Sequence, residues 1–242
     1  MSQALRDYLS VWKEKPVLRV VYADIFDRIA TVCVAGPTLE IGGGVGNLKE
    51  RVDGVISSDI QYAEWLDLVA DAQRLPFACG TLGNIVMLDV LHHIEFPALF
   101  FKEAQRVLRP GGRIVMVEPA ITHGSWAFYN LFHPEPVVMS ANPLEDGTPD
   151  PNRDAYESNQ AIPTLLCGKY QSRFHRMFPA LHIAQTRWFS FAVYPLSGGF
   201  RPWSLVTPKL AAVGLRIERF LERPLGRLLG FRLLMVIEKA SV

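Results

Sequence analysis

Five short apolar segments between Thr38 and Pro119 alternate with glycine-rich turns and helical patterns, and this alternation restricts the fold more than any other feature. The segments read TLEI, GVISSD, LDLVAD, NIVMLDV and GGRIVMVEP. Between Phe96 and Arg109, apolar residues recur on one face of a helix, which a proline and two glycines then end. Strands that alternate with helices in this way form a parallel sheet with covering helices, so we expect an α/β fold.

The sequence on either side of this region predicts helices first and a mixture of strands and helices last. Residues 1–35 carry apolar side chains at helical spacing, from Val17 through Ile25 to Val32. Residues 134–163 contain six prolines and few apolar residues, which is typical of a functional or mobile segment. Strands are expected at HIAQTRWFSFAVY and FRLLMVIEKA, with a basic helix between them. A length of 242 residues fits one large domain with insertions.

The charge balance gives the chain no preference for a polyanion. It contains 25 Lys and Arg against 24 Asp and Glu, a net charge of +1, so we expect no nucleic-acid partner. Its three cysteines form no C-x-x-C pair, and no apolar run reaches the length of a membrane span. We therefore expect a reduced, cytoplasmic protein without a structural zinc site. The sequence does not indicate an oligomeric state.

A glycine-rich turn directly after the first strand, EIGGGVG at residues 40–46, predicts a ligand-binding loop. Glycines let the backbone turn tightly and approach a ligand closely. The dinucleotide pattern G-x-G-x-x-G, started at Gly42, needs a third glycine at position 47, which is Asn47. This spacing speaks against a nicotinamide dinucleotide. A strand-to-helix turn without any ligand remains the alternative.

Acidic residues follow four successive strands of the expected sheet: Glu40, Asp59, Asp71 and Asp89. In an open parallel sheet, the carboxyl ends of the strands meet at one crevice, where ligands bind. A carboxylate at Asp59 can accept both hydroxyls of a ribose, and Asp71 could accept an exocyclic amine. Each acid alone could instead cap a loop, but the four together predict one shared ligand site.

The segments LEIGGGVG, VISSD, ADAQRLPF, NIVMLDVLHHI and EAQRVLRPGGRIVMVEP follow the order and spacing of a known family. Residues 36–120, with the last strand, resemble class I S-adenosylmethionine-dependent methyltransferases, in particular the type 11 small-molecule group. The resemblance implies a Rossmann-like, doubly wound sheet of seven strands, mostly parallel with an antiparallel last strand, and helices on both faces. It also implies S-adenosylmethionine as the cofactor.

The resemblance also implies the residues of the cofactor site. The glycine loop would cradle the methionine portion, Asp59 would hold the ribose, and Asp71 would meet the adenine edge. The implied residues are Glu40, Gly42, Gly44, Gly46, Asp59, Ile60, Asp71, Ala72, Leu88 and Asp89. The chain departs from the family between Asp59 and Leu68, where the short connection leaves room for only a turn of helix.

Two histidines and a glutamate are the candidate catalytic residues. His93, with His92 second, follows the fourth strand, and histidine titrates near neutral pH as a base should. Because adjacent side chains on a helix point about 100° apart, we expect at most one histidine to face the pocket and no shared metal. Glu118, at the end of the fifth strand, is a second pocket-facing candidate. Structural roles remain the alternative for all three.

The expected layout has four parts. Residues 1–35 form an N-terminal helical segment, and residues 36–120 form the S-adenosylmethionine-binding core. Residues 121–180, with several aromatic side chains and the proline-rich stretch, would form an insertion that supplies the acceptor pocket and its lid. Residues 181–242 would supply the remaining strands and a basic helix that completes the sheet.

The basic helix is expected near the end of the chain. Residues 201–242 hold eight basic against three acidic side chains, with Arg216, Arg219, Arg223 and Arg227 on one helical face. Such a helix can contact an anionic membrane surface peripherally, and a solvated face is the alternative. We expect Pro224 to interrupt it.

Together these observations predict an S-adenosylmethionine-dependent methyltransferase that acts on a small-molecule acceptor, at oxygen. After the fourth strand the chain has neither the Asn/Asp-Pro-Pro-aromatic motif of amino-directed nucleic-acid enzymes nor the Pro-Cys nucleophile of cytosine enzymes. Two alternatives stay open: a nicotinamide-dependent oxidoreductase, and a non-catalytic binding protein that keeps the methyltransferase fold.

Overall fold

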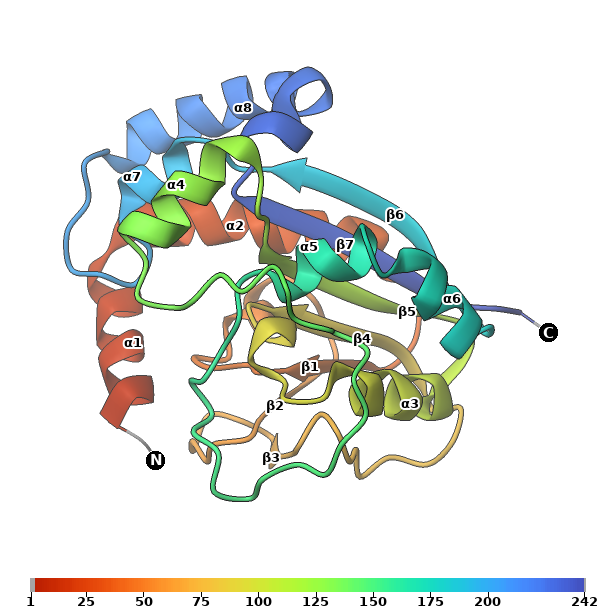
Figure 1. The fold of residues 1–242 in the computed structure, drawn as a ribbon. Helices are drawn as coiled ribbons and strands as arrows, with labels where there is room; N and C mark the ends of the chain where they lie inside the picture. The colour runs from red at the N-terminus through yellow and green to blue at the C-terminus, as the bar shows by residue number, and fades with distance from the viewer. Residues whose placement is uncertain (1–2, 242) are drawn as a thin grey trace.

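A seven-stranded sheet forms the centre of the molecule in a computed structural model that describes residues 3–241 (Figure 1). The strand order is β3-β2-β1-β4-β5-β7-β6. Strands β1 to β5 are parallel, and β7 runs antiparallel to both β5 and β6. The strands are β1 (Thr38–Ile41), β2 (Val55–Asp59), β3 (Leu68–Val69), β4 (Leu82–Leu88), β5 (Leu108–Pro119), β6 (Leu181–Phe189) and β7 (Arg232–Lys239). The expected sheet, including its antiparallel last strand, is confirmed.

Helices cover both faces of the sheet, as expected for a doubly wound fold. Neighbouring residues of a strand point to opposite faces, so Val86 packs with the core beneath α2 and α8, whereas Ile85 packs with the core beneath α3, α5 and α6. The helices are α1 (Gln3–Glu14), α2 (Pro16–Val32), α3 (Pro97–Val107), α4 (His123–Leu131), α5 (Ile162–Cys167), α6 (Gln171–Met177), α7 (Val193–Ser197) and α8 (Pro208–Leu229). Two single 3₁₀ turns, η1 (Asn47–Glu50) and η2 (Leu91–His93), follow β1 and β4.

The connections around β2 and β3 are less helical than the sequence predicts. Only η1 forms after the glycine loop. Residues 60–67 form no helix but a single turn, in which the backbone of Leu66 donates to the carbonyl of Ala63 at 3.1 Å. Two further hydrogen bonds hold this connection: Trp65 Nε1 donates to the carbonyl of Gly44 at 2.8 Å, and the backbone of Asp67 donates to Ser57 at 2.9 Å. The connection therefore folds back against the glycine loop.

Two expectations about the C-terminal part are corrected. The strand expected through Tyr194 ends at Phe189, because Ser190 adopts a positive φ of 61° and turns the chain into α7. Helix α8 does not end at Pro224 but continues through it to Leu229.

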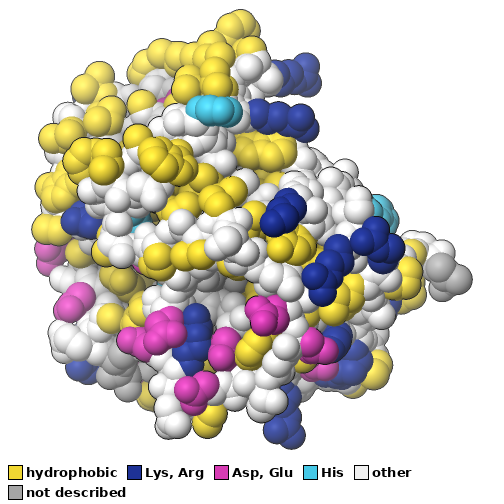
Figure 2. Space-filling view, in the orientation of Figure 1, with side chains coloured by type: hydrophobic (Ala, Val, Ile, Leu, Met, Phe, Trp, Pro, Cys, Tyr) yellow, Lys and Arg dark blue, Asp and Glu magenta, His cyan; other side chains and the backbone are white. Residues whose placement is uncertain are grey.

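Helix α8 presents several large apolar side chains to solvent and buries two acidic ones. Phe220 is 84% exposed, whereas Glu218 and Glu222 are buried. Glu222 accepts two hydrogen bonds from the guanidinium of Arg28 on α2, at 2.5 and 3.0 Å. Hydrophobic side chains gather over α4 and α8, with Lys and Arg beside them (Figure 2). Across residues 3–241, no helix combines the length and the apolar composition needed to cross a bilayer.

Candidate functional site

A cavity of about 890 Å³ lies at the carboxyl ends of β1, β2 and β4, where a parallel sheet places its ligand. Nine of the residues expected to hold the cofactor line it: Glu40, Gly42, Gly44, Asp59, Ile60, Asp71, Ala72, Leu88 and Asp89. Gly46 lies outside the lining; a Cβ there would meet the ring of Trp65 at 3.3 Å. Its positive φ of 73° makes it a turn residue at the start of η1.

The glycine loop requires glycine most strictly at Gly42. There φ is 69°, and an added Cβ would lie 2.3 Å from Cγ2 of Val90. Gly44 also has a positive φ, 50°, but its missing side chain points into open space. The backbone of this loop can therefore approach a ligand directly in the cavity.

Two buried acids hold the loop against β2. Asp59 accepts hydrogen bonds from the backbone of Gly44 at 3.1 Å and of Gln61 at 2.9 Å. Glu40 accepts a hydrogen bond from the hydroxyl of Ser57. Burial raises the pKa of Glu40 to about 7 and also raises the pKa of Asp59. The carboxylates are thus fixed in place at the cavity wall.

Glu118 lies beneath the cavity rather than in it, so the expectation that it faces the pocket is wrong. It is 1% exposed at the end of β5. Its Oε1 accepts from the backbone of Val90 and Leu91, at 2.9 and 2.8 Å, and its Oε2 lies 2.6 Å from Nδ1 of His92. Glu118 therefore fixes both the η2 turn and the orientation of the His92 ring.

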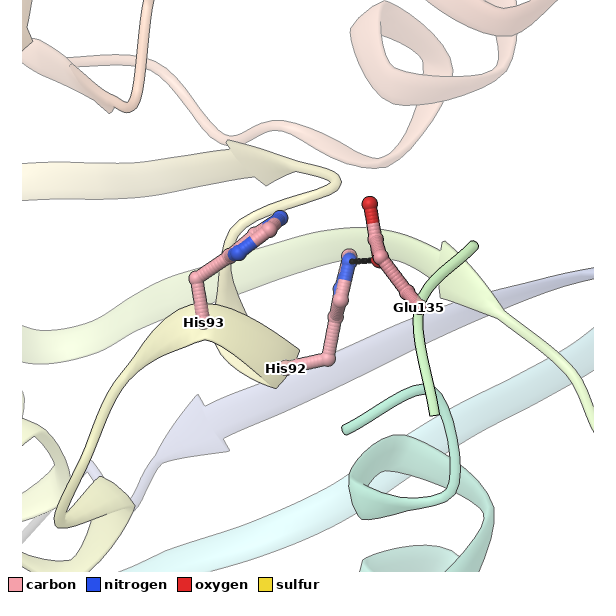
Figure 3. A group of neighbouring side chains, drawn as sticks. All are labelled: His92, His93 and Glu135. Atoms are coloured by element: carbon pink, nitrogen blue, oxygen red, sulfur yellow. Dashed lines mark ion pairs between the residues drawn. The ribbon is translucent and has the colours of Figure 1, made fainter. Parts of the chain in front are cut away.

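Both histidines line the cavity, and the expectation that at most one would do so is wrong. They belong to a single tight turn, η2, and their ring centres lie 4.2 Å apart with a 40° tilt. Figure 3 shows the two rings converging with Glu135, which reaches in from the loop after α4. His92 Nε2 lies 3.4 Å from Oε2 of Glu135.

The charges around the two rings push their pKa values apart. Burial lowers the pKa of His92, but hydrogen bonds to Glu118 and Glu135 outweigh burial and raise it to about 9. Burial lowers the pKa of His93, and the charge of His92 lowers it further. Burial would raise the pKa of Glu135, but the hydrogen bond to His92 and the nearby histidine charges lower it to about 2.

The histidine pair and Glu135 also offer three metal-ligand atoms that lie within 4.8 Å of one another. The divergence of the rings, which led us to expect no shared metal, is absent from the structure. In the present arrangement both nitrogens of His92 face carboxylates, so the cluster is held together by its own charges.

The proline-rich segment between α4 and α5 borders the cavity and is tied to η2. Pro134, Asp150 and Tyr156 belong to the cavity lining. The backbone of Asn159 donates to the carbonyl of His92 at 2.9 Å, and Arg153 Nη1 donates to the carbonyl of His93 at 2.6 Å. The segment therefore lies directly over the two histidines, across the front of the sheet in Figure 1.

The far wall of the cavity contains Tyr129, which belongs to the insertion expected to supply the acceptor pocket, and three residues that the sequence analysis missed. Tyr22 from α2, Tyr129 from α4, Tyr194 from α7 and Arg232 from β7 all line it. Arg232 is 1% exposed and forms an ion pair with Asp89. One signal could have identified Arg232: it is the charged residue directly before the apolar run LLMVI of β7. The tyrosines carry no signal that distinguishes them from core residues.

Comparison with known proteins connects the cavity to a family. Residues 39–116 match the family model of a methyltransferase domain. A demethylmenaquinone methyltransferase from Streptomyces avermitilis is 32% identical over 105 residues, which cover 41% of this chain and 44% of that protein. The chain thus matches less than half the length of this relative.

Solved structures of low sequence identity share the fold. A methyltransferase from Thermotoga maritima superposes with a TM-score of 0.53 at 13% identity, covering 92% of this chain and 91% of its own. One from Archaeoglobus fulgidus gives a TM-score of 0.51 at 14% identity, with coverages of 92% and 94%. The sheet and its helices therefore form one architecture in all three proteins.

Proposed function

Because the chain carries a class I methyltransferase domain of the type 11 group, which depends on S-adenosylmethionine, we propose that it methylates a small-molecule acceptor at an oxygen atom. The observation that carries the proposal is the cavity at the strand ends, lined by nine motif residues that end strands or lie in the turns directly after them. The methyltransferase domain match leaves no support for a nicotinamide-dependent oxidoreductase. A non-catalytic binding protein remains the alternative, which turnover would exclude.

In this proposal the half of the cavity nearest β1 and β2 holds the cofactor. The backbone around Gly42 and Gly44 would receive the methionine portion, Asp59 the ribose, and Asp71 the adenine edge. When bound, S-adenosylmethionine supplies a methyl group activated by a positively charged sulfur. The protein's own contribution is alignment of the acceptor, which can provide on the order of 7–11 kcal/mol.

His92 is the group we propose to take the proton of the acceptor hydroxyl. Glu118 holds Nδ1 at 2.6 Å, so the ring is oriented and its charged form is stabilised. Nε2 lies 3.4 Å from Oε2 of Glu135, so Glu135 must turn aside for the acceptor to reach this nitrogen. Because the pKa of His92 is raised to about 9, only its neutral fraction can take this proton, and that fraction grows as the pH approaches 9. A base of this pKa suits a hydroxyl whose own pKa is similar, such as a phenol. In the reactive complex, acceptor and His92 would share one proton. We assign His93, the first candidate from sequence, a contact with the acceptor.

Two measurements test this function. Calorimetry should show that S-adenosylhomocysteine binds and that NAD does not. Transfer of a labelled methyl group to a panel of phenols, with the matching anilines as controls, should give product with the phenols. Binding of the cofactor product without turnover on any acceptor would favour the non-catalytic alternative, and reaction of the anilines alone would contradict methylation at oxygen.

The proline-rich segment, residues 134–163, is proposed to be a lid over the acceptor half. Its hydrogen bonds to His92 and His93 and its share of the cavity lining support this role. Movement of the segment would open the cavity to an acceptor, and its return would exclude water from the reacting groups.

Peripheral contact with an anionic membrane surface remains a proposal. What favours it is the outer face of α8, where Val213, Ile217 and Phe220 are 54%, 56% and 84% exposed beside the basic side chains of Arg216 and Arg223. Sedimentation with phosphatidylglycerol vesicles should pull down the wild type and leave Ile217→Ser/Phe220→Ser in solution. Phosphatidylcholine vesicles serve as the uncharged control. Equal behaviour of the two proteins would remove this proposal.

A further inference from the structure

Arg232 is a buried charge with part of its hydrogen-bonding capacity unused. It is 1% exposed and has the largest volume among the fully buried side chains. Its Nη1 pairs with Asp89, and its guanidinium carbon lies 4.1 Å from the centre of the Tyr194 ring. Its Nε and Nη2 atoms have no hydrogen-bond partner among residues 3–241. Unpaired donors on a buried charge are unfavourable, so a function for this edge is expected.

The two unpaired atoms lie on the same edge of the guanidinium plane. That edge presents two parallel N–H groups, which match the two oxygens of a carboxylate. Asp89 binds the other terminal nitrogen and so leaves this edge free for a second anion.

The groups around Arg232 offer more donors than acceptors. Tyr22, Tyr129 and Tyr194 line the same cavity, and burial raises the pKa of all three, so their hydroxyls stay protonated. Tyr129 donates to the carbonyl of Phe231 at 2.9 Å. The acidic groups that act on these tyrosines are Asp89, which is already paired with Arg232, and Glu135, which is paired with His92.

The position of β7 in the sheet places this recess away from the glycine loop, although Arg232 pairs with Asp89, one of the expected cofactor residues. The strand order puts β7 two strands beyond β4 and three beyond β1. At about 4.8 Å per strand, the backbone of Arg232 lies roughly 14 Å across the sheet from the glycine-loop strand. The recess therefore belongs to the acceptor half of the cavity.

We propose that this recess binds a carboxylate of the acceptor, which makes the substrate an organic acid anchored by Arg232 and methylated near His92. The proposal rests on the proposed methyltransferase function. Phe26, Phe128 and Phe200 in the cavity lining favour an acid with an apolar or aromatic body. Because Nε and Nη2 are shielded from solvent, side chains of the cavity wall must move for the carboxylate to reach them.

Benzoate and benzamide are the probes, because they share a shape and differ in charge. Calorimetry on protein saturated with S-adenosylhomocysteine should show benzoate binding at least tenfold more tightly than benzamide. Arg232→Lys keeps the positive charge beside Asp89 but loses the paired N–H edge. We expect this variant to bind benzoate at least tenfold more weakly than the wild type and to change the affinity for S-adenosylhomocysteine by less than twofold.

Three results would overturn the proposal. Benzoate and benzamide could bind the wild type equally, or not at all. Arg232→Lys could bind benzoate as the wild type does. Or the variant could lower the affinity for S-adenosylhomocysteine to that for 5′-methylthioadenosine, which lacks the amino-acid part; the recess would then hold the carboxylate of the cofactor.

Two further experiments keep the test decisive. If Arg232→Lys fails to fold, Tyr194→Phe removes one donor and keeps the ring over the guanidinium. It should weaken benzoate several-fold and leave S-adenosylhomocysteine unaffected, and unchanged benzoate affinity would count against the recess. Benzoate is also titrated against the protein without S-adenosylhomocysteine. If the wild type does not bind S-adenosylhomocysteine, the proposed function is refuted, and this titration still shows whether the recess binds a carboxylate.

Discussion

The two walls of the cavity are built in different ways. One wall consists of residues 40–89, a stretch in which strand ends, positive-φ glycines and acids follow one another. The other wall brings together the η2 turn and side chains from α2, α4, α7, β7 and the segment after α4, which are up to about two hundred positions apart in sequence. The first wall depends on local backbone geometry, and the second depends on completion of the whole fold. Changes in the two walls should therefore affect cofactor and acceptor separately.

The largest expected effect comes from a substitution in the acceptor wall that lowers turnover and leaves cofactor binding unchanged. His92→Ala should lower kcat by about 10²-fold or more, because the acceptor proton loses its base. The affinity for S-adenosylhomocysteine should stay within twofold of the wild type. Steady-state kinetics on a reactive phenol and calorimetry measure the two quantities. His93→Ala is the matched control with the smaller expected loss, and equal losses from both variants would contradict the assignment of the base to His92.

A second prediction concerns the stability that the His92 cluster contributes. The pKa of His92 is raised to about 9 in the folded chain, above its ordinary 6.5, so protonation favours the folded state. This contribution is fully present below about pH 6.5 and is lost as the pH rises through 9. The difference corresponds to on the order of 3 kcal/mol. Urea unfolding at pH 6.5 and pH 9 should show that the free energy of unfolding of the wild type falls with pH, and that it falls less in His92→Gln. An equal fall in the two proteins would refute this prediction.

The cofactor wall is tested by Asp59→Ala. Removing a buried carboxylate that would accept hydrogen bonds from the ribose hydroxyls should weaken the binding of S-adenosylhomocysteine at least tenfold, or by about 1.4 kcal/mol. Binding of benzoate at the far wall should not change. Asp53→Asn, a change of an exposed acid near β2, is the control. Unchanged affinity in Asp59→Ala, measured by calorimetry, would remove this residue from the site.

The smallest expected effect lies at residues 134–163, the part of the acceptor wall that is hydrogen-bonded to the η2 turn. Amide exchange there should slow by a few-fold only when S-adenosylhomocysteine and an acceptor are both bound, because both walls must be filled before the segment closes. Hydrogen-exchange mass spectrometry with each ligand alone provides the controls. Exchange rates that stay the same whether or not the ligands are bound would show that the segment is a surface loop and not a lid.

The contrast between the walls also explains how much the sequence could predict. Motif spacing placed Asp59 and Asp71 at strand ends, and the structure brings them to one cavity because parallel strands end at the same edge. The orientation of His92 could not be read in this way, since it depends on Glu118 from the next strand and Glu135 from a distant loop. Helical spacing placed four basic side chains on one face of α8, but it could not show which face of the helix packs against the core. That choice depends on Arg28 of α2, which pairs with Glu222.

Strand β7 lies between β5 and β6, although it follows both in the chain. While the polypeptide is being synthesised, β1 to β5 can pair as they emerge, but β6 has no neighbour in the sheet until the last strand is made. Unpaired strand edges favour association with other chains, so this interval is the vulnerable stage of biogenesis. Arg232 is the first residue of β7, and the step that closes the sheet is therefore also the one that delivers the last charged side chain to the cavity.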